Sequence, residues 1–475
     1  MIHHIQEDAF ISWRVAQNIL DYGVMGYNGE EKISASTTYG YVFLSLIFNV
    51  IFGKANFIFP LLIFNTLLFT AGSYRLSQLF FEENKKRFWF TALLAFIPPA
   101  LKASYLGMEY ALVFFLYTNF LYFGLEKSKK WAYWIFPVLL IWTRLDAVIF
   151  LGITFLMELI FRKKWNWNFV FGGIVGLGSV LAFNYLYFNQ WVNNTIIAKS
   201  LAYEQPATWS KRWAFIKVQI LNFLGVIKVP VPYFNFTTVI FFATEFICFF
   251  ILLVKKDKQR IFLWILLLFS LVKMLIFQYE LSNFDWYYWI PQIFLFSFIL
   301  LYIVDLQRPK RWIAAYIIVL GIPMFGYQLI HSIATANGEW NYRRKIGIDL
   351  GNMEADKSKT IFLEPAGYVP YFSGLKTIDF VGLVDKRIQH EFLTDKKNAF
   401  YHMIFKYHPD YILAMDSFDW DNQLSPEQKT YLNAHYQFVK EYKISDHLDS
   451  NYLIIKKIYQ IKPSGINYCL YKLKN

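Results

Sequence analysis

Ten apolar stretches, each close to the length of a membrane-spanning helix, limit what this chain can fold into. A helix needs about 17–25 predominantly apolar residues to cross a bilayer. The stretches lie near residues 56–74, 88–101, 108–125, 131–143, 146–161, 168–187, 236–254, 260–278, 286–304 and 312–330. Hydrophobic residues make up 56% of the 475 positions and charged residues only 17%, whereas soluble domains are about 45–50% apolar and 25% charged. We therefore expect a polytopic α-helical membrane protein with about ten spans.

The net charge of +13 is concentrated in short basic runs between these stretches. The runs fall at 85–87, 127–130, 162–164, 255–260 and 308–311. Cytoplasmic loops of membrane proteins carry such an excess of Lys and Arg, so we place these loops in the cytoplasm and expect no nucleic-acid partner. The region 188–235 and the tail 331–475 then lie on the extracytoplasmic, periplasmic side of a multi-pass protein of the cytoplasmic (inner) membrane.

The N-terminal region is expected to lie on the same outer side. The segment 36–53 would break the topology if it crossed the membrane, so we expect it to form a juxtamembrane helix in the outer interface. Residues 1–35 are then outside as well, although no apolar segment precedes them. We therefore expect that a first span is missing, through truncation or a misassigned start. Three parts result: an outer segment 1–55, a transmembrane domain 56–330 and an extracytoplasmic domain 331–475.

The tail 331–475 has the pattern of a small α/β domain. Short apolar runs predict strands at 360–363, 377–383, 411–415, 452–456 and 468–473. Between them, residues 425–438 have a helical pattern. Ser425, Pro426 and Glu427 provide an N-cap, a first-turn proline and an early acid for that helix.

Two adjacent carboxylates, Glu7 and Asp8, open the outer segment ahead of an amphipathic pattern that places Ile11, Val15 and Ile19 on one stripe. Carboxylates in this position can act as a general base or bind a divalent cation such as Mg or Mn. They can equally mark the start of a helix, where the dipole favours acidic residues. The residues alone leave both interpretations open.

Further charged and aromatic residues map to the same outer face. Arg144 and Asp146 flank a turn between two spans, and Glu109 begins a neighbouring hairpin. A charge pair in such apolar surroundings needs a partner or a ligand, and a structural salt bridge at a helix end is the simpler interpretation. Lys199 suits a phosphate group and the aromatic cluster 285–288 suits a sugar face, although both residue types also anchor proteins at lipid headgroups.

Two ionisable residues lie deeper, on consecutive spans. Glu245 and Lys273 differ in depth by about four residues, or about 6 Å at the helical rise, so we expect a buried ion pair between them. The alternative is that Lys273 faces a cavity for a lipid phosphate. The histidines and the two cysteines, Cys248 and Cys469, have no spacing typical of a metal site or a disulfide framework.

Seven short motifs, spread over nearly the whole chain, occur in an order typical of one enzyme family. The outer segment contains Glu7-Asp8-Ala9-Phe10-Ile11-Ser12-Trp13-Arg14, followed by Asn18, Gly23 and Asn28-Gly29-Glu30. The membrane part contains Gly107-Met108-Glu109, Arg144-Leu145-Asp146, Asn194-Thr195 with Ala198-Lys199, and Trp286-Tyr287-Tyr288. The tail contains Ala366-Gly367-Tyr368-Val369-Pro370-Tyr371 and Ile378-Asp379-Phe380-Val381-Gly382-Leu383. In these motifs the chain resembles GT-C membrane glycosyltransferases, most closely the branch that includes the mycobacterial terminal arabinofuranosyltransferases.

The chain departs from that family pattern in three places. The first acid is Glu7 where the family has Asp, which weakens a metal site built on two aspartates. Leu145 replaces the proline of the family's R-P-D motif, and the family's first transmembrane helix is absent. The family also has a juxtamembrane outer helix after the acidic loop, in agreement with the interpretation of 36–53.

The resemblance implies transfer of a sugar, with inversion, from a polyprenyl-phosphate carrier to a cell-envelope glycan, lipid or protein acceptor on the outer face. Asp8, with Glu7 beside it, would be the catalytic base, and these two would hold a divalent cation if one is needed. Lys199, Arg144 and Arg14 would bind the donor phosphate. Residues that would contact substrate are Glu109, Asp146, Asn194, Trp286, Tyr287 and Tyr288.

Three other functions remain as alternatives. An oligosaccharide or O-antigen ligase uses a related fold and a lipid-diphosphate donor. A flippase or transporter of lipid-linked sugars would show inverted repeats and broken helices at the midplane, whereas this sequence has no internal repeat and gathers its polar groups at one face. A structural scaffold for envelope assembly would retain its activity without Asp8.

Overall fold

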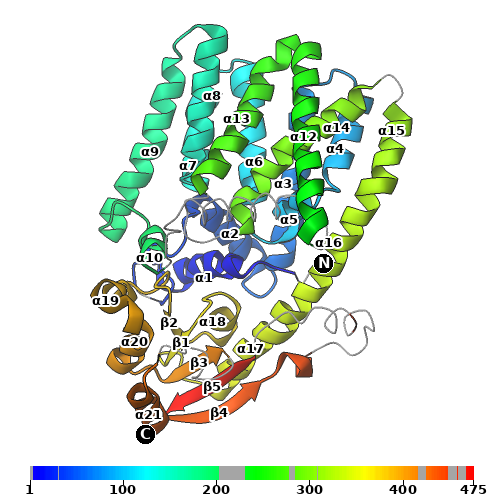
Figure 1. Ribbon diagram of the computed structural model, residues 1–475. Coiled ribbons are helices and arrows are strands. Elements are labelled where there is room, and N and C mark those ends of the chain that lie inside the picture. Colours follow the sequence, from blue (N-terminus) through cyan, green and yellow to red (C-terminus); the bar gives the residue numbers. More distant parts are fainter. Residues whose placement is uncertain are drawn as a thin grey trace.

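The computed structural model describes residues 4–29, 31–202, 231–277, 284–306, 309–415, 424–447, 457 and 467–474. A bundle of helices forms one end of the molecule and a small α/β domain forms the other (Figure 1). Helix α1 (Glu7–Tyr22) lies across the boundary between the two parts. Most of the predicted outer loop 188–235 and the predicted strand 452–456 lie outside the described residues.

The bundle contains most of the predicted apolar stretches as helices. They are α3 (Ile58–Gln78), α4 (Asn84–Leu94), α5 (Pro98–Tyr105), α6 (Tyr110–Asn119) continued by a π-helical turn (Phe120–Glu126), α7 (Ala132–Thr143), α8 (Ala147–Arg162), α9 (Trp167–Phe188), α12 (Val231–Lys255), α13 (Arg260–Phe277) and α14 (Trp289–Asp305). A long helical segment then descends to the α/β domain. It comprises α15 (Pro309–Tyr316), α16 (Ile322–Ala336) and α17 (Arg344–Met353), joined by the π-helical turns Ile317–Gly321 and Asn337–Arg343.

Within the described residues, four helices are long and apolar enough to cross a membrane, or five if one bent pair forms a single span. That pair is α5 with α6, which are bent by 108° at Gly107, whose φ is +82°. The expected span 88–101 is broken into α4 and α5. Ile97 is extended (φ −78°, ψ 140°) because Pro98 disfavours a helical residue before it. The structure thus supports a polytopic membrane protein, and the count of ten spans stays a prediction.

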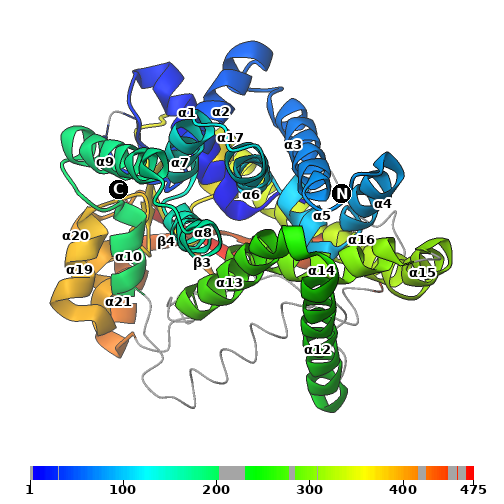
Figure 2. The ribbon, with the colours of Figure 1, turned by 90° about the horizontal axis from the view of Figure 1, so that it is seen from above.

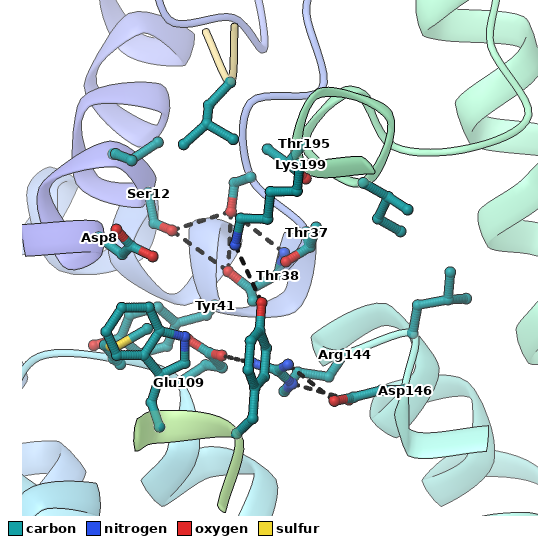
Figure 3. Close-up of a pocket in the computed structure, with 18 of the residues that line it drawn as sticks. Asp8, Ser12, Thr37, Thr38, Tyr41, Glu109, Arg144, Asp146, Thr195 and Lys199 are labelled. Carbon is teal, nitrogen blue, oxygen red and sulfur yellow. Dashed lines mark hydrogen bonds and ion pairs between the residues drawn. The ribbon is translucent and has the colours of Figure 1, made fainter. Parts of the chain in front are cut away.

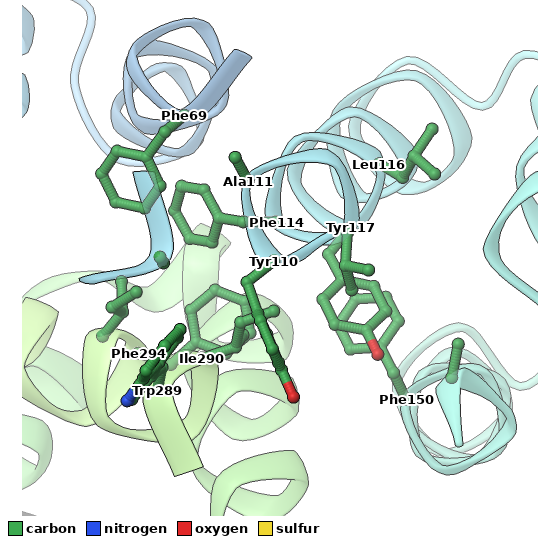
Figure 4. Close-up of a cluster of buried hydrophobic side chains, with 14 of the residues drawn as sticks. Phe69, Tyr110, Ala111, Phe114, Leu116, Tyr117, Phe150, Trp289, Ile290 and Phe294 are labelled. Atoms are coloured by element: carbon green, nitrogen blue, oxygen red, sulfur yellow. The ribbon is translucent and has the colours of Figure 1, made fainter. Parts of the chain in front are cut away.

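Aromatic side chains fill the centre of the bundle (Figure 4). Phe69 of α3 stacks on Phe114 of α6 with ring centroids 4.7 Å apart, and Tyr117 stacks on Phe150 of α8 at 4.0 Å. Phe294 of α14 contacts Phe114 at 5.8 Å. These offset pairs join four helices through large buried side chains, an arrangement that contributes packing energy beyond apolar burial.

Two glycines bring α7 and α9 into close contact, side by side in both views (Figures 1 and 2). A Cβ on Gly172 would collide with the carbonyl oxygen of Tyr133, and one on Gly176 would lie 3.1 Å from the carbonyl oxygen of Pro137. Small residues four positions apart permit such close approach of membrane helices. Gly173 and Gly178 on the same helix have no atom within 4 Å of that position.

The α/β domain is a five-stranded sheet with strand order β2-β1-β3-β5-β4. Its strands are β1 (Thr360–Leu363), β2 (Lys376–Asp379), β3 (Tyr411–Met415), β4 (Tyr436–Tyr442) and β5 (Tyr468–Leu473). Strands β2, β1 and β3 are parallel, while β5 is antiparallel to β3 and to β4. Its helices are α18 (Tyr368–Ser373), α19 (Arg387–Asp395), α20 (Ala399–Tyr407) and α21 (Pro426–His435).

The sequence predictions for this domain are confirmed in outline. Strands are present at 360–363, 411–415 and 468–473, and the predicted strand 377–383 is represented by β2, which ends at Asp379. Ser425 caps α21 as predicted, in a capping box with Gln428. The predicted helix 425–438 is wrong at its end, because the chain enters β4 directly after His435.

The first two helices lie at the domain end of the bundle. Helix α1 begins at Glu7, as the acidic pair and the apolar stripe predict, and buries Ile11 and Val15. Helix α2 (Tyr39–Phe52) occupies the predicted interface segment and has 14 residues, about 21 Å at the helical rise. Ile47, Val50 and Ile51 on this helix are exposed, as a helix lying against lipid requires.

We predict that Gly172→Ala lowers the melting temperature of the purified protein in detergent. Overpacking of a tight contact costs about 1–3 kcal/mol, because the backbone carbonyl of Tyr133 cannot move without displacing α7. Gly173→Ala is the matched control and should leave the melting temperature unchanged or slightly higher, since alanine favours the helix. Equal melting temperatures for the two variants would contradict the close packing of α7 on α9.

Candidate functional site

A cavity of about 460 Å³ lies where the bundle meets α1 and the α/β domain (Figure 3). Its wall is formed by α1, the segment 35–41, the start of α8, the end of α13, the residues Trp286 and Tyr287, and α10 (Asn194–Ala202). Five of the predicted site residues converge on it with charged side chains: Asp8, Glu109, Arg144, Asp146 and Lys199. The structure thus brings together five residues that are spread over nearly 200 positions of the sequence.

Four of the buried charges around this cavity form a closed network. Arg144 donates from Nε and Nη2 to the two carboxylate oxygens of Asp146, both at 2.9 Å, and from Nη1 to Glu109. Lys273 of α13 lies 3.1 Å from Asp146 Oδ2. Arg144 also donates to the Tyr110 hydroxyl at 2.9 Å. Two cations and two carboxylates balance one another, as buried ionic groups require.

The expected ion pair between Glu245 and Lys273 is wrong. Lys273 pairs with Asp146 instead, because α13 packs against α8 and presents Lys273 to its start. Helix α12, which carries Glu245, packs mainly against α14. Similar depth in the membrane did not place the two side chains together, since depth leaves the rotation about each helix axis undetermined.

Asp8 and Lys199 project into the cavity from different elements, α1 and α10 (Figure 3). Lys199 donates to the Tyr287 hydroxyl at 3.1 Å and lies 4.8 Å from the centre of the Phe284 ring. Within the described part of the chain, neither Asp8 nor Lys199 has an ion-pair partner within 4 Å. Asp8 and Lys199 are therefore the two charged side chains in the described part of the cavity that form no ion pair, and their charges are opposite.

The surroundings shift the pKa values of both groups upward. Burial raises the pKa of Asp8 above its usual value, and the positive charge of Lys199 opposes that shift. Burial disfavours the charged form of Lys199, but the oxygen of Tyr287 and the carboxylate of Asp8 outweigh it and raise the pKa of Lys199. Asp8 is thus a stronger base than an ordinary aspartate, and Lys199 stays cationic at neutral pH.

A group of hydroxyl side chains on the cavity wall escaped the sequence analysis. Ser12 and Ser36 are 3.0 Å apart, and Ser36 lies 3.0 Å from Thr38. Thr37 and Tyr41 line the same wall. The hydroxyl-rich run 34–38 directly before a helix was the available signal, but such runs also occur in ordinary loops and helix caps.

The carboxylate of Glu7, unlike that of Asp8, is bound by groups of the α/β domain and of the segment that leads into it. Oε1 accepts hydrogen bonds from the backbone N–H groups of Gly367 and Tyr368, each at 2.8 Å, and Oε2 lies 3.1 Å from Nη1 of Arg343. The Arg343 guanidinium also binds Glu339 at 3.0 Å. A glutamate side chain is one methylene longer than that of aspartate, and at this position its carboxylate reaches the backbone N–H groups of the domain.

Arg14 and Asn194, predicted to bind substrate, instead dock the same domain. Arg14 donates to the carbonyl oxygens of Pro370 and Leu375 at 2.6 and 2.8 Å. Asn194 Nδ2 donates to those of Gly382 and Leu383 at 3.0 and 2.9 Å. Neither residue lines the cavity. We therefore exclude Arg14 from the candidate phosphate ligands.

The aromatic cluster divides between the cavity and the core. Trp286 and Tyr287 line the cavity, and their predicted contacts with substrate stay a prediction. Tyr288 does not line it and is buried at the start of α14, with 2% of its surface exposed. Adjacent residues of the 3₁₀ turn Asp285–Tyr288 point in different directions, so three aromatic residues in sequence cannot all face one ligand.

The predicted metal pair Glu7 and Asp8 does not fit a two-carboxylate site. Three donors already occupy the carboxylate of Glu7, which leaves Asp8 as the single acidic ligand from this motif. Among the residues that the structure describes, no group of three or more His, Cys, Asp or Glu side chains is placed to hold a metal ion.

Comparisons with known proteins identify the fold. The structure of ArnT from Cupriavidus metallidurans bound to undecaprenyl phosphate matches with a TM-score of 0.59 at 11% identity, over 92% of this chain and 91% of that chain. ArnT from the same organism in the apo state matches with a TM-score of 0.56 at 11% identity, over 99% and 94%. A family described as "Domain of unknown function (DUF8728)" matches residues 331–466. No curated protein sequence matches the chain.

The likeness to the two ArnT structures, at 11% identity, shows the fold. It supports the expected polytopic helical membrane protein, and the expected membership of the GT-C superfamily stays a prediction. The narrower resemblance to the terminal arabinofuranosyltransferase branch stays a prediction.

We predict that Arg144→Met destabilises the protein strongly. The substitution leaves Glu109 and Asp146 with only Lys273 to balance them, and breaking a buried ion pair costs about 3–5 kcal/mol. The melting temperature of the purified protein measures the effect. Lys54→Met, which removes the cation of an exposed pair with Asp21, is the control and should cost about 0–1 kcal/mol. Similar melting temperatures for the two variants would contradict the closed network.

Proposed function

We propose that this protein is a membrane glycosyltransferase that transfers a sugar from a polyprenyl-phosphate donor to an acceptor hydroxyl. The observation that carries the proposal is the pairing of a basic carboxylate, Asp8, with an uncompensated cation, Lys199, in one cavity of a GT-C fold. Undecaprenyl phosphate is the ligand of the ArnT structure, which supports a donor of this class. The cavity also has an apolar wall, including Ile149 and Phe277, beside which a hydrocarbon chain can lie.

The reaction assigned to this pair is a single displacement. The acceptor oxygen forms a bond to the anomeric carbon while its proton passes to Asp8. The bond between that carbon and the phosphate oxygen breaks, and its electron pair leaves with polyprenyl phosphate. Lys199 stabilises the charge that develops on the phosphate. Attack opposite the leaving group inverts the configuration of the sugar.

The charge of the cavity favours a monophosphate over a diphosphate donor. A sugar phosphodiester carries one negative charge, which Lys199 can balance. Arg144 and Lys273 are already committed to Glu109 and Asp146, so the described part of the cavity has no second uncompensated cation for a diphosphate. A lipid-diphosphate ligase therefore receives less support. A flippase receives less support as well, because the charged groups that line the cavity gather at one end of the bundle instead of the midplane.

The location of the reaction follows from the proposed topology. The cavity lies at the end of the bundle opposite the basic loops 85–87 and 162–164, and the positive-inside rule places those loops in the cytoplasm. The sugar would then be transferred on the periplasmic face of the inner membrane. An acceptor there is a cell-envelope glycan, lipid or protein, and such a reaction belongs to polysaccharide and envelope biogenesis.

We predict that Asp8→Asn lowers the rate of sugar transfer about 10²–10⁴-fold, the usual contribution of a general base. The full-length protein in nanodiscs would be supplied with a panel of polyprenyl-phosphate sugars and an envelope extract, and released polyprenyl phosphate would be measured. Asp21→Asn, which changes an exposed residue of the same helix, should retain full activity. Turnover by a folded Asp8→Asn protein at the rate of Asp21→Asn would contradict the assignment.

We also predict an acidic limit of activity set by Asp8. Because burial raises the pKa of Asp8, the base is protonated and lost at a higher pH than for an exposed aspartate. The rate should therefore fall as pH decreases through this raised pKa. The positive charge of Lys199 opposes this rise in the pKa of Asp8. Lys199→Met should therefore move the acidic limit of activity to a still higher pH, and it should also weaken donor binding. A pH profile of kcat/KM measures the limit, and an identical limit in Lys199→Met would contradict the coupling.

A further inference from the structure

A second cavity, of about 200 Å³, adjoins the first on the side of the α/β domain. The two cavities share five lining residues: Asp8, Ile11, Lys199, Trp286 and Leu383. The proposed base and the proposed phosphate ligand therefore lie at the junction between them. A group held in the second cavity would therefore lie beside Asp8.

The two cavities differ in what surrounds them. At the first, Val148, Ile196 and Ile276 are 39%, 43% and 44% exposed, so apolar side chains border its mouth as a lipid-facing opening requires. The second is enclosed by the start of α1, by α16 and the turn after it, and by the loops 364–366 and 379–383 of the domain. The α/β domain and the start of the chain up to Ile11 therefore form most of its wall.

Carboxylates dominate the charge of the second cavity. Five line it, namely Glu7, Asp8, Glu339, Glu364 and Asp379, together with two cations, Lys199 and Arg343. Arg343 is bound by Glu7 and Glu339, and Asp379 accepts the N–H groups of Leu383 and Val384 at 2.7 and 2.8 Å.

Glu364 carries the remaining negative charge with Asp8. Among the described residues no cation lies within ion-pairing distance of Glu364, and burial raises its pKa. Like charges repel and a buried anion needs a cationic partner. An anionic ligand is therefore disfavoured, whereas hydroxyl groups can donate hydrogen bonds to these oxygens.

One wall of the second cavity is aromatic. The rings of Phe284 and Trp286 stack with centroids 4.3 Å apart and planes 9° apart, and both residues line the cavity. The face of an aromatic ring carries partial negative charge, which suits the polarised C–H groups of a sugar ring. The volume is below the roughly 300–1,000 Å³ of drug-sized ligand pockets, so the cavity suits one small ring.

We propose that this second cavity binds the acceptor of the transfer reaction, and that the part bound there is a single sugar residue without phosphate or carboxylate groups. Its hydroxyl would reach Asp8 at the junction, opposite the donor held by Lys199. The proposal rests on the proposed glycosyltransferase function and adds the chemical class of the acceptor. It assigns Glu364 as a specificity-determining residue that rejects anionic acceptors.

Saturation-transfer NMR on the full chain in nanodiscs tests the proposal, because it detects weak binding directly. The probes are methyl glycosides of several hexoses and pentoses, glucosamine and glucose 6-phosphate, each at the same concentration. We expect transfer to at least one neutral glycoside, retained or stronger transfer to glucosamine, and none to glucose 6-phosphate. Binding of glucose 6-phosphate as strong as that of neutral sugars, or no binding of any neutral sugar, overturns the proposal.

Two substitutions locate the binding. Thr335→Phe places a large side chain in the second cavity only, since Thr335 lines it and not the first, and should abolish the sugar signal. Thr394→Phe, on an exposed position of α19, is its control and should retain it. Glu364→Arg should gain binding of glucose 6-phosphate, while Glu364→Gln should not lose the neutral sugar. A sugar signal that survives Thr335→Phe overturns the location.

Binding of undecaprenyl phosphate, measured in parallel, separates this proposal from the proposed function. Thr335→Phe should leave that binding unchanged within about twofold, a difference well below 1 kcal/mol. If sugars bind as expected but undecaprenyl phosphate does not, the donor assignment fails and the second cavity stands. If undecaprenyl phosphate binds and no sugar does, the acceptor cavity fails and the donor assignment stands.

Discussion

The need of every buried charge for a partner organises the domain end of this helical bundle. An isolated ion in an apolar interior is so unfavourable that it must be paired, hydrogen-bonded or neutralised. Arg144, Lys273, Glu109 and Asp146 meet that need among themselves, and they tie the starts of two spans to α13. Asp8 and Lys199 are left to face the cavity. The candidate chemistry follows from which charges the structure balances and which it leaves for a ligand.

Helix α1 connects this chemistry to the α/β domain. Its first residue, Glu7, and its second turn, through Arg14, hold backbone groups of the domain, while Asp8 between them faces the cavity. Asn194 makes the corresponding contact from α10, five residues before Lys199. Asp8 and Lys199, the two proposed catalytic groups, thus each share a helix with a residue that contacts the domain. The position of the domain and the geometry of the site are consequently coupled.

Periodicity and turn chemistry were sufficient to predict the helical bundle, the start of α1, the Ser425 cap and three of the strands. The break between α4 and α5 was not predicted, because it lies inside an apolar run that Pro98 and Pro99 interrupt. The end of α21 was not predicted either, because β4 follows this helix with no intervening turn residue. Several of the motif residues line one cavity, and their roles stay a prediction. They did not separate docking residues such as Arg14 from cavity residues such as Lys199, because partners more than 150 residues away decide that difference.

Equilibrium binding of undecaprenyl phosphate to the full chain in nanodiscs tests most directly whether Asp8 and Lys199 form a donor site with divided roles. Lys199→Met should weaken binding about tenfold or more, since a charge-assisted contact to phosphate is lost. Asp8→Asn should bind as tightly as the unmodified protein or more tightly, because a negative charge near the phosphate is removed. Unchanged affinity in Lys199→Met, or weaker binding in Asp8→Asn, would contradict that division.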